Sequence, residues 1–303
     1  MLQNYIGELS ALATAFCWAI TAMSFQIASK KIGSLSVNLI RLFIGFLCLT
    51  IFAYFSRGLW FPTDASYHNW QWLLLSGVVG IFLGDIMLFH AFETIGARVS
   101  LLITSMVPPI AAITGYIILN EKLTYLQIIG MIVTLTGISL VVLSKQKGEK
   151  QVKFNYPLAG ILLAIGGSFG QAIGLVLSKY GMQTETEILY NPFGATQIRI
   201  IGGAICFILF FTVTNRWSRI KSGVKNKEAM LFTTLGSIFG PFLGISLSLV
   251  AVQYTTTGVA STIIALVPVI IIPPAVIFFK EKVTLKEVIG AFIAVGGVVL
   301  CFI

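Results

Sequence analysis

Charged residues are scarce in this chain, and that scarcity excludes most classes of protein. The 303 residues include only 20 basic and 11 acidic side chains, about 10% of the total. A soluble domain carries roughly one-quarter charged residues, because its surface must be hydrated. Hydrophobic residues make up 57% of the sequence and the mean hydropathy is +0.94, which excludes a disordered chain as well. The composition therefore predicts a polytopic membrane protein.

The sequence also lacks paired cysteines and catalytic motifs. Its four cysteines, Cys17, Cys48, Cys206 and Cys301, lie in apolar runs without a CxxC motif, so neither a disulfide framework nor a zinc site is expected. It has no phosphate-binding loop, nucleophile elbow or dinucleotide fingerprint, so we expect no enzyme, no cofactor and no metal. The net charge of +9 is spread over short connections, which argues against a nucleic-acid partner.

Long apolar runs are abundant. A hydrocarbon core about 30 Å thick requires roughly 20 helical residues. We therefore predict an all-α integral membrane fold with ten transmembrane helices. The predicted spans are about 7–29, 34–55, 71–92, 97–119, 124–144, 158–180, 193–214, 230–253, 258–279 and 284–303.

The two halves of the sequence resemble each other. At an offset of 160 residues, about a quarter of positions 73–143 find an identical partner. We therefore predict two five-helix repeats, residues 1–144 and 158–303, joined by a polar linker at 145–157. The matched pairs include Gly80-Ile-Phe-Leu-Gly84 with Gly240-Pro-Phe-Leu-Gly244, Val107-Pro108 with Val267-Pro268, and Glu121-Lys122 with Glu281-Lys282.

An odd number of spans in each repeat means that the second repeat must enter the membrane from the opposite side. Two similar halves of opposite orientation can adopt two pseudo-symmetric arrangements, one open to each side, and this is typical of transporters. The sequence therefore predicts two inverted repeats around a central cavity.

Basic residues favour one side of the predicted bundle. Fifteen of the 20 lie in or beside the connections that follow odd-numbered spans, and short basic connections stay in the cytoplasm. We therefore predict a multi-pass protein of a bacterial-type inner membrane, with both termini periplasmic. The fifteen are Lys30, Lys31, Arg98, Lys145, Lys147, Lys150, Lys153, Arg216, Arg219, Lys221, Lys225, Lys227, Lys280, Lys282 and Lys286.

Glycine and proline recur inside the spans. Gly166, Gly170 and Gly174 form a stripe on the sixth span, and such small residues allow helices to pack closely in lipid. Proline interrupts the fourth and ninth spans and frees backbone carbonyls, which need a polar or water-lined neighbour. We place these two spans beside the cavity, and a kink used only for packing is the alternative. The prolines are Pro108, Pro109, Pro268, Pro273 and Pro274.

Ionisable side chains within the spans are few. Asp85, His90 and Glu93 share one face of the third span. A charge that faces lipid costs several kcal/mol (roughly 3 at the bilayer centre), so this face must meet protein or water. These groups either line a transport path, where His90 could relay a proton, or satisfy one another structurally.

Other polar residues at membrane depth are Trp18, Gln26, Gln171 and Ser248. Each either bonds a neighbouring helix or contacts a ligand. Arg41 and Arg199 lie near the starts of the second and seventh spans, and we expect them to anchor helix ends at the lipid headgroups.

These features together resemble the EamA domain of the drug/metabolite transporter superfamily. The resemblance rests on two five-helix copies, the proline of the fourth span, Asn120-Glu121-Lys122-Leu123, Gly130 and Gly137, and on Val267-Pro268, Lys280-Glu281-Lys282 and Gly290 in the second copy. It implies a basket of paired helices around a cavity, with alternating access.

Members of that superfamily export amino acids and metabolites, or exchange sugar phosphates and nucleotide sugars. Its small four-helix multidrug members use a glutamate deep in the first helix for proton coupling, whereas here the first span carries only Glu8, at its outer end. Proton coupling would then fall to Asp85, His90 or Glu93.

We therefore expect a secondary transporter that exports a small, amino-acid-like metabolite, with protons as a candidate second partner. A translocator of hydrophobic cations or lipid-linked molecules is one alternative, and a non-catalytic membrane scaffold is another. The sequence specifies no oligomeric state.

Overall fold

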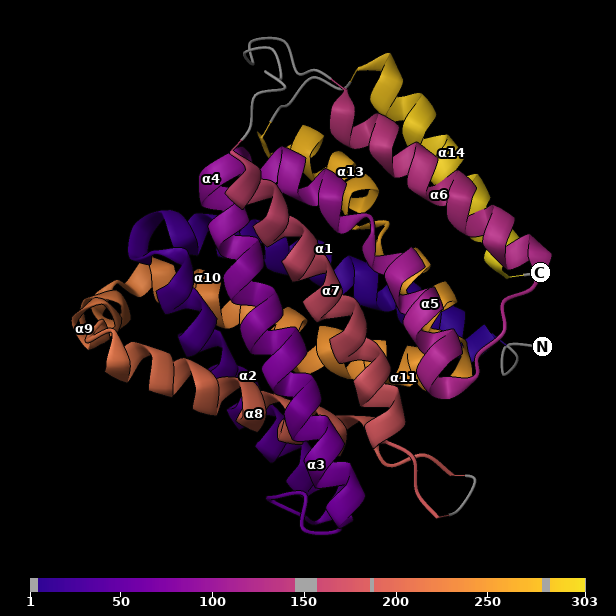
Figure 1. The fold of residues 1–303 in the computed structure, drawn as a ribbon. Coiled ribbons are helices and arrows are strands. Elements are labelled where there is room, and N and C mark those ends of the chain that lie inside the picture. Colours follow the sequence, from indigo (N-terminus) through magenta and orange to yellow (C-terminus); the bar gives the residue numbers. More distant parts are fainter. Residues whose placement is uncertain (1–4, 145–156, 186–187, 280–283, 303) are drawn as a thin grey trace.

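The computed structural model describes residues 5–144, 157–185, 188–279 and 284–302, and all the regular structure in these ranges is helical (Figure 1). The predicted linker, 145–157, lies outside the described residues except for Pro157. The elements are α1 (Ile6–Ile32), α2 (Ser34–Arg57), α3 (Tyr67–Ser76), η2 (Gly77–Gly84), α4 (Asp85–Thr104), α5 (Val107–Leu119), α6 (Tyr125–Leu143), α7 (Leu158–Gly181), α8 (Pro192–Val213), α9 (Trp217–Lys225), α10 (Lys227–Ser237), η3 (Ile238–Gly244), α11 (Ile245–Tyr254), α12 (Thr257–Ile264), α13 (Val267–Phe279) and α14 (Leu285–Cys301).

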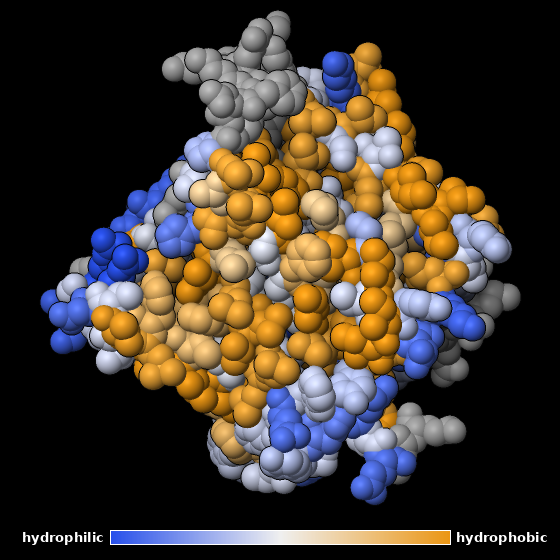
Figure 2. Space-filling view, in the orientation of Figure 1, coloured by the Kyte–Doolittle hydropathy of each residue, from blue (hydrophilic) through white to orange (hydrophobic). Residues whose placement is uncertain are grey.

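Nine helical segments in the described ranges are long and apolar enough to cross a membrane. They agree with the first nine predicted spans within a few residues at most ends. The tenth corresponds to α14, which has 17 residues and is shorter than the roughly 20 that a crossing requires. The tenth crossing therefore stays a prediction. Figure 2 shows hydrophobic side chains over the broad middle of one face, with hydrophilic ones gathered over α9 and at the lower end beyond α3.

Helix α4 reverses direction within its own length. Gly167 on α7 lies against Leu88, while the hydroxyl of the adjacent Ser168 lies 3.3 Å from the carbonyl oxygen of Ile103. A straight helix would separate Leu88 from Ile103 by about 22 Å, so the chain turns back between them. The predicted connection between the third and fourth spans, 93–96, lies within this reversal.

A turn divides each of the two proline-containing spans. It precedes α5, which begins Val107-Pro108-Pro109, and also α13, which begins Val267-Pro268. Proline fits the first turn of a helix, where its missing N–H has no intrahelical partner. Pro273 and Pro274 lie inside α13, which continues through them.

Two π-helices occupy equivalent places in the two halves, because η2 and η3 end at Gly84 and Gly244, 160 residues apart. Each packs against the first helix of the other half, η2 on α7 and η3 on α1. The predicted packing role of the α7 glycines is confirmed, because a Cβ on Gly174 would lie 2.6 Å from the Cα of Gly80 and one on Gly170 would lie 2.7 Å from that of Gly84.

Helices α6 and α14 pair at the edge of the bundle (Figure 1), with Gly130 and Gly137 facing Gly297 and Gly290. Neighbouring glycines on α14 offer a matched test of this contact. A Cβ on Gly297 would lie 2.4 Å from the backbone nitrogen of Thr134, whereas one on Gly296 would meet nothing within 4 Å.

We expect Gly297→Ala to separate the two helices and to lower the stability of the detergent-solubilised protein by about 2 kcal/mol, as overpacking does. Gly296→Ala should be neutral or stabilising by up to ~1 kcal/mol, because alanine favours helix. Thermal unfolding of both variants beside the unmodified protein measures the difference, and equal midpoints would contradict this packing.

Candidate functional site

An ion pair lies inside the bundle between α2 and α4. Asp85 is the first residue of α4, directly after η2, and its carboxylate accepts a hydrogen bond from the guanidinium of Arg41 on α2. The two side chains keep 15% and 16% of their surface exposed, so the pair is not sealed. The Arg41 guanidinium also lies 5.6 Å from the centre of the Phe25 ring, at cation–π distance.

A second arginine joins this pair. Arg199 on α8 is 6% exposed and interacts electrostatically with Asp85. Our expectation that Arg41 and Arg199 anchor helix ends at the headgroups is therefore wrong. Each lies seven residues inside its helix, about 10 Å along the axis, and the buried carboxylate of Asp85 offers a better partner than the interface. Arg41, Asp85 and Arg199 are called the arginine cluster below.

Trp18 and Gln171, two of the predicted cavity residues, lie against equivalent glycines of the two π-helices. A Cβ on Gly244 would lie 2.6 Å from the indole Nε1 of Trp18, and one on Gly84 would lie 3.5 Å from Cγ of Gln171. Gln171 thus packs against the end of η2, one residue before Asp85 in the sequence.

The remaining predicted residues are not brought together with Asp85. Its partner is Arg41 rather than His90, which is exposed on α4. Gln26 is exposed on α1, while Ser248 is buried and donates to the carbonyl of Ile245 at 2.7 Å. The side chain of Glu93 lies outside the described part of the structure.

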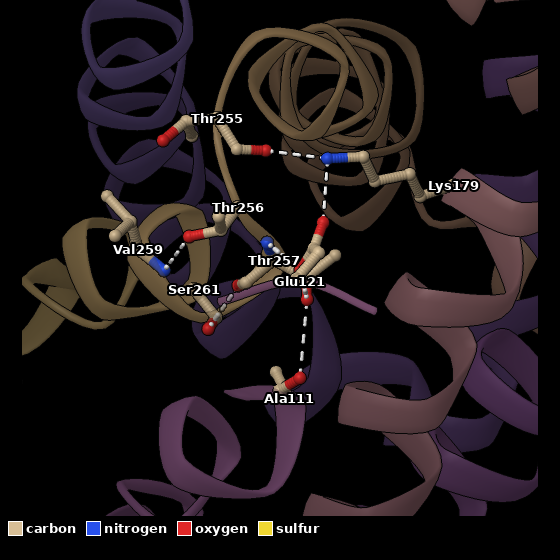
Figure 3. Close-up of polar contacts among 8 residues, drawn as sticks. All are labelled: Ala111, Glu121, Lys179, Thr255, Thr256, Thr257, Val259 and Ser261. Atoms are coloured by element: carbon tan, nitrogen blue, oxygen red, sulfur yellow. Dashed lines mark hydrogen bonds and ion pairs between the residues drawn. The ribbon is translucent and has the colours of Figure 1, made fainter. Parts of the chain in front are cut away.

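A second polar cluster joins the ends of several helices (Figure 3). Glu121, after α5, forms an ion pair with Lys179 near the end of α7, with Oε1 2.7 Å from Nζ. Its other oxygen, Oε2, accepts hydrogen bonds from the N–H and the hydroxyl of Thr257, at 2.8 and 2.6 Å. Lys179 also donates to the carbonyl of Thr255 at 2.8 Å. These four residues are called the Glu121 cluster.

Local structure directs Glu121 into this cluster. Asn120 ends α5 in the left-handed conformation, with φ 54°, which asparagine tolerates better than most residues. The chain then turns back, and the Glu121 N–H donates to the carbonyl of Gly115 at 3.2 Å. Gly115 makes room, because a Cβ there would lie 2.4 Å from the Thr257 hydroxyl. The carboxylate therefore meets the amino end of α12, where the helix dipole favours negative charge.

The same end of the bundle holds a third polar cluster. Arg57 pairs with Asp64, which also accepts a hydrogen bond from the phenol of Tyr190 at 3.0 Å. Burial raises the pKa of Tyr190 to about 12, so this phenol stays a donor at every physiological pH. Gln253 ties α11 to the same region by donating to the Tyr190 carbonyl at 2.9 Å.

The opposite set of connections is joined by a weaker contact. Lys31, in the last turn of α1, pairs with Glu228 on α10 at 2.5 Å, but these side chains are 35% and 57% exposed. Exposed pairs of this kind contribute little. Among the described residues, the Glu121–Lys179 pair, whose side chains are 10% and 18% exposed, is therefore the stronger of the two ion pairs.

The sequence analysis did not identify the Glu121 cluster. Glu121 repeats as Glu281 in the second half, but a glutamate beside a span end is ordinarily hydrated, so the repeat alone did not distinguish it. In the described ranges, no group of three His, Cys, Asp or Glu residues comes together that could hold a metal ion.

Comparison with known proteins agrees with this architecture. The chain is 20% identical to an uncharacterized transporter of Archaeoglobus fulgidus, over 96% of each chain. It is 23% identical to the uncharacterized transporter YdfC of Bacillus subtilis, over 87% of this chain and 79% of the relative. A solved crystal structure superposes with a TM-score of 0.77 at 14% identity, covering 97% of this chain and 95% of the other.

The EamA-like transporter family matches two segments, residues 5–143 and 158–303, which together make up most of the sequence. The relatives are described as transporters, and the described helices suit a lipid bilayer. The protein is thus a multi-pass membrane transporter, and the chain belongs to the EamA-like transporter family.

Proposed function

We propose that the protein is a secondary transporter that exports a small, amino-acid-like metabolite across a bacterial-type inner membrane by alternating access. In this proposal residues 1–144 and 158–303 are inverted five-helix repeats of ten spans in all. A central cavity between them takes the substrate.

One observation carries the proposal. Each π-helix packs on the first helix of the other half, and the residues that meet there correspond between halves. Gly84 meets Gln171 where Gly244 meets Trp18, and Gly80 meets Gly174 where Gly240 meets Thr21. This exchange of partners is what two repeats related by a two-fold axis produce. Where the repeats are inverted, two equivalent seams allow the bundle to open at either one.

The Glu121 cluster fits this cycle. The Glu121 cluster links the connections before α6 and α12 to the end of α7. In one half of the cycle these contacts hold that end shut, and in the other half they must separate. Among the described residues at the other end, the exposed Lys31–Glu228 pair is a weaker contact.

Efflux from proteoliposomes tests the transport proposal. Vesicles that contain the full-length protein are loaded with the twenty proteinogenic amino acids, and mass spectrometry follows their loss. We expect one amino acid, or one related group, to leave at least tenfold faster than from protein-free vesicles. The Gly296→Ala protein should match the unmodified one, since that Cβ would meet open space. Retention of all twenty at the protein-free rate would contradict an amino-acid-like substrate.

The same vesicles distinguish the alternatives. Loss of a fluorescent hydrophobic cation with retention of amino acids would indicate a drug translocator. Flipping of a labelled lipid would indicate a translocator of lipid-linked molecules. If no solute moves faster than in protein-free vesicles, a scaffold is the better description.

We also propose that both termini are periplasmic, because the basic connections follow odd-numbered spans. A C-terminal alkaline phosphatase fusion in bacterial cells should then be active, and a C-terminal green fluorescent protein fusion should be dark. The opposite pair of signals would reverse the orientation, and with it the side that the Glu121 cluster closes.

A further inference from the structure

The arginine cluster carries more positive than negative charge. Arg41 and Arg199 contribute two positive charges, and Asp85 is the acid that interacts with both. An uncompensated cation inside a membrane protein costs several kcal/mol (about 3 on insertion scales). A negatively charged group on a ligand would remove that cost, so the cluster favours a ligand that brings one such group to the arginines.

Hydrogen-bonding capacity in the cluster points the same way. In the described structure, Nε of Arg199 and Nε of Arg41 are buried without a hydrogen-bond acceptor. Asn38, one turn before Arg41, is 1% exposed, and neither polar atom of its amide has a partner. Buried polar groups are normally satisfied, and two guanidinium groups offer far more donors than one carboxylate can use. The arginine cluster therefore lacks a hydrogen-bond acceptor for these donors.

The arginine cluster borders one of the two π-helices. Arg199 lies beside η2, where a Cβ on Gly80 would be 3.4 Å from its Nη2. Gln171 approaches the same π-helix at Gly84. Arg41 and Asp85 keep 15% and 16% of their side-chain surface exposed, and π-helical turns are frequent at functional sites.

The two arginines occupy corresponding positions, 158 residues apart, in the two halves. Gln197 on α8 donates to the hydroxyl of Thr50 on α2 at 3.2 Å, and the ring centres of Phe193 and Phe52 lie 4.4 Å apart, so α2 and α8 run antiparallel. Arg199 is therefore displaced from Arg41 by about 10 Å along the helix pair. A ligand with several hydrogen-bond acceptors can pass from one guanidinium to the other when the bundle closes on one side and opens on the other.

We propose that the transported molecule carries a carboxylate, which the guanidinium groups of Arg199 and Arg41 bind inside the bundle. This inference rests on the proposed transport function and names its substrate class. Guanidinium groups bind carboxylates in a bidentate manner. Asp85 binds Arg41 until the carboxylate of the substrate takes the place of the Asp85 carboxylate.

Acetate is the test ligand, because it is a small carboxylate that has a neutral analogue of nearly the same shape. Full-length protein in detergent micelles is titrated with ¹³C-acetate at constant ionic strength, and the line width of the acetate signal reports binding. ¹³C-acetamide is the neutral ligand of the same shape. We expect the unmodified protein to broaden acetate and not acetamide.

Two substitutions should shift the result in opposite directions. Arg199→Gln removes a guanidinium and should weaken acetate binding at least fivefold. Asp85→Asn removes the competing carboxylate and should strengthen it several-fold, a gain that misfolding does not produce. Arg216→Gln, a change outside the cluster at an arginine that lies over Phe210, should leave the line width unchanged.

If Arg199→Gln yields no folded protein by size-exclusion chromatography, Arg199→Lys replaces it. That variant keeps the positive charge but lacks the planar guanidinium that binds a carboxylate through two parallel hydrogen bonds. It should therefore bind acetate more weakly than the unmodified protein. Equal broadening of acetate and acetamide would overturn the inference. Full acetate broadening in the Arg199 variant would overturn it too, as would loss of acetate broadening in Asp85→Asn protein that elutes as folded in size-exclusion chromatography.

The efflux assay separates this inference from the transport proposal. Efflux of a metabolite without a carboxylate, together with no acetate binding, would leave transport standing and overturn the carboxylate site. Acetate binding that depends on Arg199, with no efflux of any solute, would overturn transport and leave the site.

Discussion

Glu121→Gln should lower the stability of the protein by about 3 kcal/mol, the scale observed when one partner of a buried ion pair is removed. Glu121 and Lys179 are only 10% and 18% exposed, so water cannot solvate Lys179 well enough to replace the lost ion pair. Glutamine keeps the shape but leaves the Lys179 ammonium with the Thr255 carbonyl alone. It also weakens two hydrogen bonds at Thr257. Thermal unfolding in detergent measures the loss.

Neighbouring positions supply the controls for this prediction. Lys122→Gln changes the charge of the next residue, which is exposed, and should shift stability by less than about 0.5 kcal/mol. Lys179→Gln should resemble Glu121→Gln, and the double variant should lose clearly less than the sum, because the same contact is removed twice. Additive losses would show that the two residues act separately.

The helical architecture was largely predictable because lipid imposes a simple rule on the chain. A span must be long and continuously apolar, so nine of the ten predicted spans have counterparts of sufficient length. Proline at the start of α5 and α13 also has an unambiguous local consequence. The π-helices were not predicted, because they arise from the close approach of Gly80 and Gly84 to α7 rather than from local preference.

The candidate site was harder to predict because it depends on which charges meet across helices. Asp85 was identified only from the free-energy cost of a charge within the membrane, since a carboxylate at that depth needs a partner. Its partner proved to be Arg41. We had assigned Arg41 to the headgroups, because a long side chain seven residues from the start of a helix can reach the interface. The proton relay through His90 stays a prediction, and the Asp85–Arg41 pair gives it no direct support.

The arginine cluster predicts an unequal response to the loss of its members. Asp85→Asn leaves the charges of Arg41 and Arg199 without a carboxylate, whereas Arg41→Gln leaves Asp85 with Arg199. We therefore expect Asp85→Asn to lower stability by about 3 kcal/mol and Arg41→Gln by clearly less. Against a total of roughly 5–15 kcal/mol, the first loss is large. Unfolding in buffer without carboxylates measures both variants.

Glu228→Gln is the matched control, because it removes the carboxylate of an ion pair that is 35% and 57% exposed and should change stability by no more than about 1 kcal/mol. The order of the two cluster variants decides the interpretation. If Arg41→Gln proves as damaging as Asp85→Asn, the Arg41–Asp85 pair acts as an isolated contact and Arg199 does not share the carboxylate. If Asp85→Asn is the more damaging variant, all three charges form one unit, because one acid then compensates two cations.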